Sequence, residues 1–182
     1  IMTSERASNR RNGITILDIT EPAHPRKVTH FTEGLTGGVH NVWIEDELVY
    51  AVHNGTNALH IIDISDPGNP VNAGRWEVEN PARSLHDVIV QDGLAYLSYW
   101  DDGLVILDVG AGISGGTPTE PVEVSRYVYR TRWGAETYGN THHAIRYRDY
   151  VFVADEIFGC SECVNGPRGH VHVVDVTDIE SP

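Results

Sequence analysis

The stretch Leu-His-Ile-Ile-Asp-Ile-Ser-Asp-Pro-Gly-Asn-Pro, residues 59–70, decides the fold of this chain because it recurs. Apolar residues, an aspartate and a turn follow in the same order at residues 13–25 and 170–182, and the apolar part with its aspartate returns at 103–109. The first two intervals between the repeated aspartates are 45 residues long and the last is 67. A period of this length is the sequence signature of a repeat architecture. The repeated aspartates are Asp18, Asp63, Asp108 and Asp175.

Each repeat predicts four short strands joined by tight turns. The apolar run before the aspartate is too short and too rich in β-branched residues for a helix, so it reads as a strand buried on both faces. Short antiparallel strands in fours are the plan of a β-propeller blade. The predicted fold is therefore all-β, a partial β-propeller of about three to four blades. In the best-defined unit the strands are expected at residues 39–44, 48–52, 58–64 and 71–78.

The repeats also divide the chain. We expect a polar N-terminal end at residues 1–12 and a propeller segment over residues 13–182. Roughly four blades are the lower limit for closing a propeller, and open ends leave unpaired strand edges. The remaining blades of a longer chain, or self-association, are therefore expected to cover these ends. The segment is expected to hold a partial blade, two full blades and an incomplete blade, at residues 13–33, 38–79, 84–130 and 140–182.

The repeated aspartates are interpreted as structural residues. Each ends a buried strand and precedes a turn, where a carboxylate can accept hydrogen bonds from backbone N–H groups. The full pattern, G-L-x-I-[LV]-D-[IV]-[ST]-[DE]-P-x-x-P, resembles the LVIVD-repeat family of β-propellers. The copy with Asp63, Pro67 and Pro70 matches best, whereas residues 110–120 insert a Gly-rich loop and Ile179 replaces a proline. The resemblance implies the fold and an extracellular, cell-surface or periplasmic location, and it implies no particular reaction.

Composition excludes several classes of function. With 13 basic and 26 acidic residues the formal net charge is −13, so nucleic acid and anionic membrane surfaces are poor partners. No apolar run approaches the length that spans a bilayer. The chain also carries neither a phosphate-binding loop nor the nucleophile motif of hydrolases.

Three histidines occupy one equivalent position in successive repeats. His40, His86 and His142 each lie six residues before the charged residue of a tight turn. In a propeller the first strand of each blade lines the channel, so these imidazoles are expected to meet at one channel mouth. Two interpretations stay open: the same structural hydrogen bond in each blade, or a site for a transition metal such as Zn, Cu or Fe. Further candidates for this site are His143, Asp87, Asp155 and Glu156.

A cysteine pair lies in an inserted loop of the last repeat. Cys160 and Cys163 form a C-x-x-C sequence, and the inserted loop ends at His170. This spacing permits a disulfide, a metal site that includes His170, or two free thiols. A disulfide is the expected state if the protein lies outside the cytoplasm.

Two functions compete. The first is a non-catalytic binding module that presents variable loops at the channel mouth to a protein, a glycan or a small molecule. The alternative is a metal-dependent enzyme of the oxidoreductase type built on the channel histidines. Whether the chain is an enzyme stays open, with the sequence favouring the non-catalytic module, and no residue is assigned a catalytic role.

Overall fold

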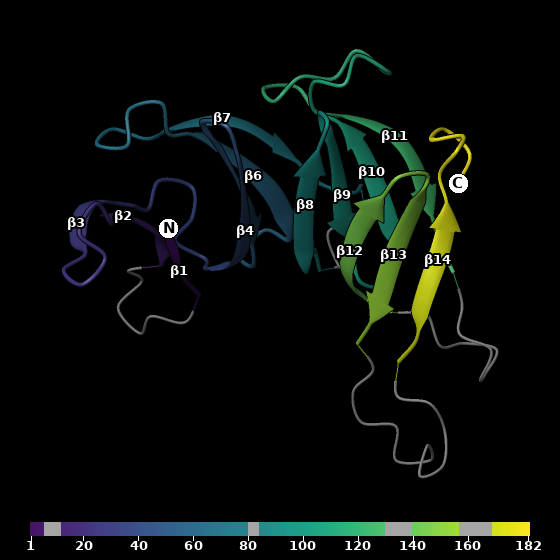
Figure 1. Ribbon diagram of the computed structural model, residues 1–182, viewed down its shortest axis with the longest axis horizontal. Helices are drawn as coiled ribbons and strands as arrows, with labels where there is room; N and C mark the ends of the chain where they lie inside the picture. Colours follow the sequence, from purple (N-terminus) through teal and green to yellow (C-terminus); the bar gives the residue numbers. More distant parts are fainter. Residues whose placement is uncertain (6–11, 80–83, 130–139, 157–168) are drawn as a thin grey trace, which may run out of the picture.

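The computed structural model describes residues 1–5, 12–79, 84–129, 140–156 and 169–182, and in these ranges it contains strands and no helix. The strands form four antiparallel sheets that stand next to one another like the blades of a propeller (Figure 1). The predicted fold class, an all-β partial propeller, is confirmed. Within the described ranges nothing helical has the length and hydropathy needed to traverse a lipid bilayer.

The four sheets are called blades 1 to 4 in chain order. Blade 1 holds three strands, blades 2 and 3 hold four each, and blade 4 holds three, with strands paired in chain order within each blade. The strands of blades 1 and 2 are β1 (Met2–Ser4), β2 (Gly13–Asp18), β3 (Arg26–Phe31), β4 (Val39–Glu45), β5 (Leu48–His53), β6 (Ala58–Asp63) and β7 (Val71–Trp76). Those of blades 3 and 4 are β8 (Asp87–Gln91), β9 (Leu94–Ser98), β10 (Leu104–Asp108), β11 (Val122–Tyr127), β12 (Thr141–Tyr147), β13 (Tyr150–Asp155) and β14 (Val171–Asp175).

Blade 1 includes a strand that the sequence did not predict. β1 lies within residues 1–12, which were expected to be a polar end, and it pairs with β2 from Met2 opposite Thr15 to Ser4 opposite Gly13. Since β2 carries the repeated Asp18, β1 takes the place that the second strand has in the other blades. The strand brings the next residue, Glu5, to the channel mouth, where it bonds to His40.

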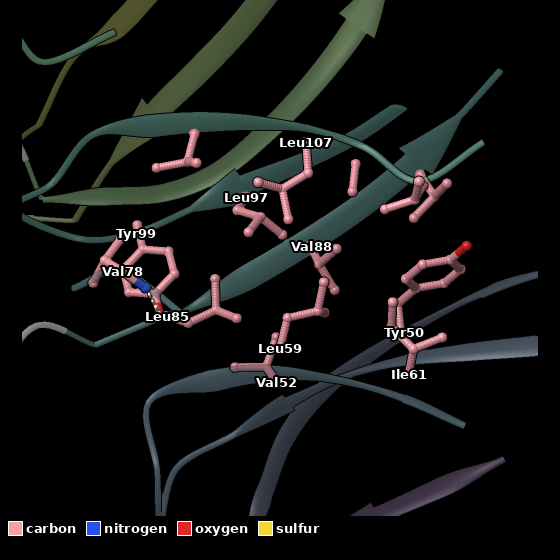
Figure 2. Packing of buried hydrophobic residues seen from close by; sticks show 14 residues of the cluster. Tyr50, Val52, Leu59, Ile61, Val78, Leu85, Val88, Leu97, Tyr99 and Leu107 are labelled. Carbon is pink, nitrogen blue, oxygen red and sulfur yellow. Dashed lines mark hydrogen bonds between the residues drawn. The ribbon is translucent and has the colours of Figure 1, made fainter. Parts of the chain in front are cut away.

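The core lies between the blades. In blade 2, Tyr50, Leu59 and Ile61 are buried and pack against blade 3, where Val88 and Leu97 meet them (Figure 2). Two similar clusters join blade 1 to blade 2 and blade 3 to blade 4. Because strands of an inner blade are buried on both faces, they need apolar residues without alternation, which is why the repeated strands read as continuous apolar runs.

The repeated aspartates hold the turns that follow them. Asp63 accepts a hydrogen bond from the backbone N–H of Ser65 at 2.8 Å, and Asp18 and Asp175 make the same contact at 2.9 Å. Asp108 is fully buried and anchors the Gly-rich loop by accepting bonds from five backbone N–H groups between residues 110 and 116. Burial raises the pKa of Asp108, but the bonds from Gly110, Ser114, Ala111 and Gly116 outweigh it and lower the pKa to about 2.

Blade 4 presents an apolar face to solvent. Phe152, Val171 and Val173 are 38%, 68% and 58% exposed. By register from the repeated aspartate and the tight turn, they are equivalent to Tyr50, Leu59 and Ile61, which blade 3 buries. The last sheet therefore has the composition of a surface against which another sheet packs.

Candidate functional site

The three equivalent histidines meet at one end of the inner strands. β4, β8 and β12 are the innermost strands of blades 2, 3 and 4 and stand side by side (Figure 1). The Nε2 atoms of His40 and His86 are 3.2 Å apart, and the ring centroids of His86 and His142 are 4.1 Å apart. Residues that are 46 and 56 positions apart in the chain thus form one cluster.

The hydrogen bonds of His86 and His40 decide which nitrogen of each ring carries its lone pair. His86 Nδ1 lies 3.1 Å from the backbone carbonyl of His142, and His40 Nδ1 lies 2.7 Å from the Glu5 carboxylate. A carbonyl and a carboxylate oxygen only accept, so both Nδ1 atoms carry hydrogen. In the neutral rings the two Nε2 lone pairs then face each other. This arrangement favours a cation beside the pair, either a metal ion or a shared proton.

Glu156 supplies a carboxylate to the same place. Its Oε2 atom lies 3.3 Å from His142 Nε2 and 3.7 Å from His86 Nε2. One ligand atom from each of these three residues falls within 4.8 Å of the others, which is a spacing that can hold a metal ion. Burial, followed by the neighbouring His142 and His40 rings, lowers the pKa of His86. The four residues His40, His86, His142 and Glu156 are called the channel-mouth cluster below.

A cavity of about 450 Å³ adjoins the channel-mouth cluster. It is formed by the starts of the inner strands and by the loops that join the second strand of each blade to the third, as the repeat pattern predicts. Its walls are both polar and aromatic, so a small ligand beside the cluster could hydrogen-bond and stack. The lining residues are Glu5, His40, Asn54, Asn57, Ser84, Leu85, His86, Trp100 and Glu156.

The residues next in sequence form a separate layer that joins the blades. Asp87 is buried and accepts a hydrogen bond from the Asn41 amide at 2.5 Å through one carboxylate oxygen. Its other oxygen bonds to His143 Nδ1, and the backbone N–H of Val88 donates to the first. Asp87 and His143, both candidates for the metal site, are therefore engaged with each other across the boundary between blades 3 and 4.

Asp155 lies outside the channel-mouth cluster, although the sequence placed it there. Its carboxylate is fully buried and faces blade 3, where it accepts a hydrogen bond from the hydroxyl of Tyr129. Burial and this bond raise the pKa of Tyr129, so the phenol keeps its proton and donates. Side chains alternate along a strand, so Asp155 and the next residue, Glu156, point to opposite faces. His172 bonds to the same carboxylate at 3.0 Å.

The sequence missed two contributors. Glu5 belongs to a segment without repeat periodicity, and His172 occupies a position that is apolar in the neighbouring repeat, so neither had a pattern to mark it. The cysteine pair, Cys160 and Cys163, lies outside the described residues.

Comparison with family models gives the chain its place among known proteins. The model for the LVIVD repeat matches residues 8–32, 36–78 and 82–128, which together make up more than half of the sequence. The chain belongs to the LVIVD repeat family. No curated protein in the comparison matches it.

The family match and the structure agree on the repeat. The three matched segments contain the strands β2–β3, β4–β7 and β8–β11, so each LVIVD match corresponds to one blade. Blade 4 lies beyond the last match, yet β12–β14 pair in the same antiparallel order and keep the aspartate turn through Asp175. Blade 4 therefore keeps the scaffold of the LVIVD blades, and the positions at which it differs from them are candidates for a role beyond that scaffold.

Proposed function

We propose that this LVIVD propeller is a binding module whose channel mouth binds a divalent transition-metal ion through His86, His142 and Glu156. The observation that carries the proposal is the convergence of two imidazole nitrogens and one carboxylate oxygen from two blades and a loop. Two imidazoles with one carboxylate are a donor set that Zn²⁺ and Fe²⁺ accept in proteins.

The separations between the donor atoms support this assignment. Ligand bonds of about 2.0–2.2 Å in a tetrahedral site place neighbouring donors roughly 3.3–3.6 Å apart. The Glu156 oxygen lies 3.3 Å and 3.7 Å from the two imidazole nitrogens. The hydrogen bond from His86 Nδ1 to the His142 carbonyl also fixes the tautomer that leaves Nε2 available, which is the usual arrangement for a ligating histidine.

Three protein donors leave coordination positions open toward the adjoining cavity. A bound ion would then anchor one end of a small ligand whose other end contacts Trp100 and Asn54. This supports the non-catalytic module as the first candidate. The open positions also support the second candidate, a metal-dependent oxidoreductase, because an iron or copper ion there could bind both substrate and oxidant.

The location and partners of the module are part of the proposal. The family resemblance supports a place outside the cytoplasm, and fractionation of the source cells tests it. The exposed Phe152, Val171 and Val173 support a further blade or a second copy of the chain on the open face of blade 4, because the equivalent residues of blade 2 are buried by the next blade.

Metal analysis of the full chain tests the proposed function. The protein is stripped with chelator, reloaded with Zn²⁺, Fe²⁺ or Cu²⁺ and freed of excess ion before its metal content is measured. His86→Ala and His142→Ala should each lose one equivalent, and His24→Ala, at an exposed histidine in a turn, should lose none. Equal metal content in all four proteins would refute the site. Turnover of a reducing substrate by the loaded protein would favour the oxidoreductase.

A further inference from the structure

Blade 4 carries a second group of two imidazoles and one carboxylate, away from the channel mouth. Asp155 ends β13, and His170 and His172 lie on the neighbouring strand β14 or directly before it. One ligand atom from each of the three lies within 4.8 Å of the others. These three residues are called the blade 4 cluster.

The β-sheet itself places the three side chains on one face. His170 and His172 are two positions apart on an extended chain, so their side chains point the same way. The backbone N–H of Asp155 donates to the carbonyl of His170 at 3.0 Å, which makes the two residues opposite neighbours in the ladder. Directly opposite residues share a face. The cluster is thus held by the backbone pairing of β13 with β14.

Within the cluster one carboxylate oxygen serves as the common point. Asp155 Oδ1 accepts the bond from the Tyr129 hydroxyl, and Oδ2 lies 3.0 Å from His172 Nε2 and 3.9 Å from His170 Nδ1. Tyr129 also bonds to Thr141 at 2.9 Å and packs on the His172 ring, so the carboxylate has a fixed orientation. Such support behind a carboxylate is typical of metal ligands.

A purely structural explanation accounts for His172 but not for His170. His172 forms an ordinary hydrogen bond to the carboxylate. Nδ1 of His170, in contrast, is a buried ring nitrogen with no hydrogen-bond partner among the described residues, and it lies on the Oδ2 side of the carboxylate. A buried polar atom without a partner is costly. A cation between His170, His172 and Asp155 would satisfy it.

Blade 3 shows that the fold does not require polar groups at these positions. In blade 3 the backbone bond equivalent to that between Asp155 and His170 joins Tyr99 to Gly103, and Val105 takes the place of His172. Tyr99 and Val105 are fully buried in an apolar cluster. In blade 3 the same propeller corner thus packs well without any imidazole or carboxylate, so the repeated scaffold does not by itself require the blade 4 cluster.

We infer that Asp155, His170 and His172 form a second site for a divalent transition-metal ion such as Zn²⁺, independent of the channel mouth. Tyr129 is the positioning residue that orients the carboxylate. The site has three protein donors, of which one imidazole lies on β14 and the other directly before it. All three ligands belong to blade 4, whereas those of the channel-mouth site come from two blades and a loop. The blade 4 site therefore depends on one neighbour only, blade 3, which supplies Tyr129.

The test uses the full chain with the His86→Ala change as background, so that the channel-mouth site does not contribute. Two variants copy blade 3: His172→Val reproduces Val105 and His170→Gly reproduces Gly103. The matched control is His60→Val, the equivalent change in blade 2. Zinc content after chelator treatment and reloading is measured together with the visible absorption of the Co²⁺-loaded protein. Circular dichroism without metal verifies that each variant is folded.

The background protein and the His60→Val control should hold one equivalent of Zn²⁺. Both blade 4 variants should hold no Zn²⁺, and after loading with Co²⁺ they should lack the visible absorption of a Co²⁺ ion that is coordinated by imidazole nitrogens. Metal-free background protein would overturn the inference, as would folded His172→Val and His170→Gly variants that keep their zinc. The inference would also be overturned if the bound Zn²⁺ were lost in the double variant Cys160→Ser/Cys163→Ser and kept in the two blade 4 variants. The single His86→Ala change tests the proposed function separately, because it removes only the channel-mouth equivalent.

Discussion

The imidazole of His86 donates its Nδ1 hydrogen to the backbone carbonyl of His142, 3.1 Å away, and the two rings lie 4.1 Å apart. The bond runs from the inner edge of blade 3 to the backbone of blade 4. It therefore orients the His86 ring relative to the next blade and leaves Nε2 directed at Glu156. The boundary between two blades thus prepares the donor atoms of the channel-mouth cluster.

Glu156→Gln should weaken metal binding at the channel mouth. Changes to residues that merely support a metal ligand cost about 10–100-fold in affinity, and removal of a charged ligand should cost at least about 100-fold. Competition with a chromogenic Zn²⁺ chelator measures the affinity. Glu47→Gln, at an exposed turn between β4 and β5, is the control and should bind normally. Equal Zn²⁺ affinity in the two variants would show that Glu156 is not a metal ligand.

The sequence predicted the scaffold well because the scaffold is periodic. Asp63 and its equivalents mark each repeat, and the three histidines that lie six residues before the charged turn residue of their repeats, His40, His86 and His142, meet in the structure. The blade 4 cluster was not predicted, since its members interrupt the pattern and Asp155 lies 15 or more positions from the two histidines in the chain. What brings Asp155 and His170 together is strand pairing across a long insertion, and spacing alone does not reveal that pairing.

The same limit explains the misplacement of Asp155. Asp155 is the last residue of β13 and Glu156 follows it, and the sequence treats the two acidic residues alike. Their side chains point to opposite faces, because alternation continues to the end of a strand. Glu156 therefore reaches the channel histidines and Asp155 the interface with blade 3. A one-residue difference decides which cluster each carboxylate joins.

Stability should fall in mild acid because of His60. Burial, with the nearby His53 and Arg75, lowers the pKa of His60 to about 4, below its ordinary value of 6.5. The unfolded chain therefore takes up a proton as the pH falls from 6.5 to 4, while the folded chain does not. The free energy of unfolding is highest above pH 6.5 and should decrease by up to about 3 kcal/mol over this window, with no further contribution from His60 below it.

Denaturant titrations at pH 7.5 and pH 4.5 measure this effect in the wild type and in His60→Val. The variant should lose most of the difference between the two pH values, because Val105 occupies the equivalent position in blade 3 without a titratable group. His24→Val, at an exposed turn, should keep the whole difference. A pH dependence of His60→Val equal to that of the wild type would mean that another group is responsible.

Asp108→Ala should be the most destabilising change among the repeated aspartates. Its buried carboxylate accepts five backbone hydrogen bonds, and its removal leaves these donors unpaired in the loop after β10. We expect a loss of at least about 3 kcal/mol in the free energy of unfolding. Asp63→Ala removes a single exposed backbone contact and should cost less. Similar losses in the two variants, measured by denaturant titration, would contradict the anchoring role of Asp108.

Tyr129→Phe should distinguish the positioning role of Tyr129 from the ligand role of the blade 4 cluster. The change removes the hydroxyl that donates to Asp155 and bonds to Thr141, and it keeps the ring that packs on His172. Since a buried carboxylate loses a donor, the metal-free protein should unfold about 1–3 kcal/mol more easily. Zinc affinity in the His86→Ala background should fall by roughly 10-fold or more, because the carboxylate is no longer held in place.

Tyr127→Phe is the matched control for this change, since Tyr127 stacks near Tyr129 on the same blade and lies outside the blade 4 cluster. Saturating Zn²⁺ should raise the unfolding temperature of Tyr129→Phe by more than it raises that of His172→Val, because the former keeps all three ligands and the latter does not. This comparison distinguishes positioning from ligation. If Zn²⁺ raises the unfolding temperature of Tyr127→Phe but of neither other variant, Tyr129 is itself indispensable for binding. If Zn²⁺ raises the unfolding temperatures of all three variants equally, Asp155 and His172 hold no metal and their hydrogen bond serves the fold alone.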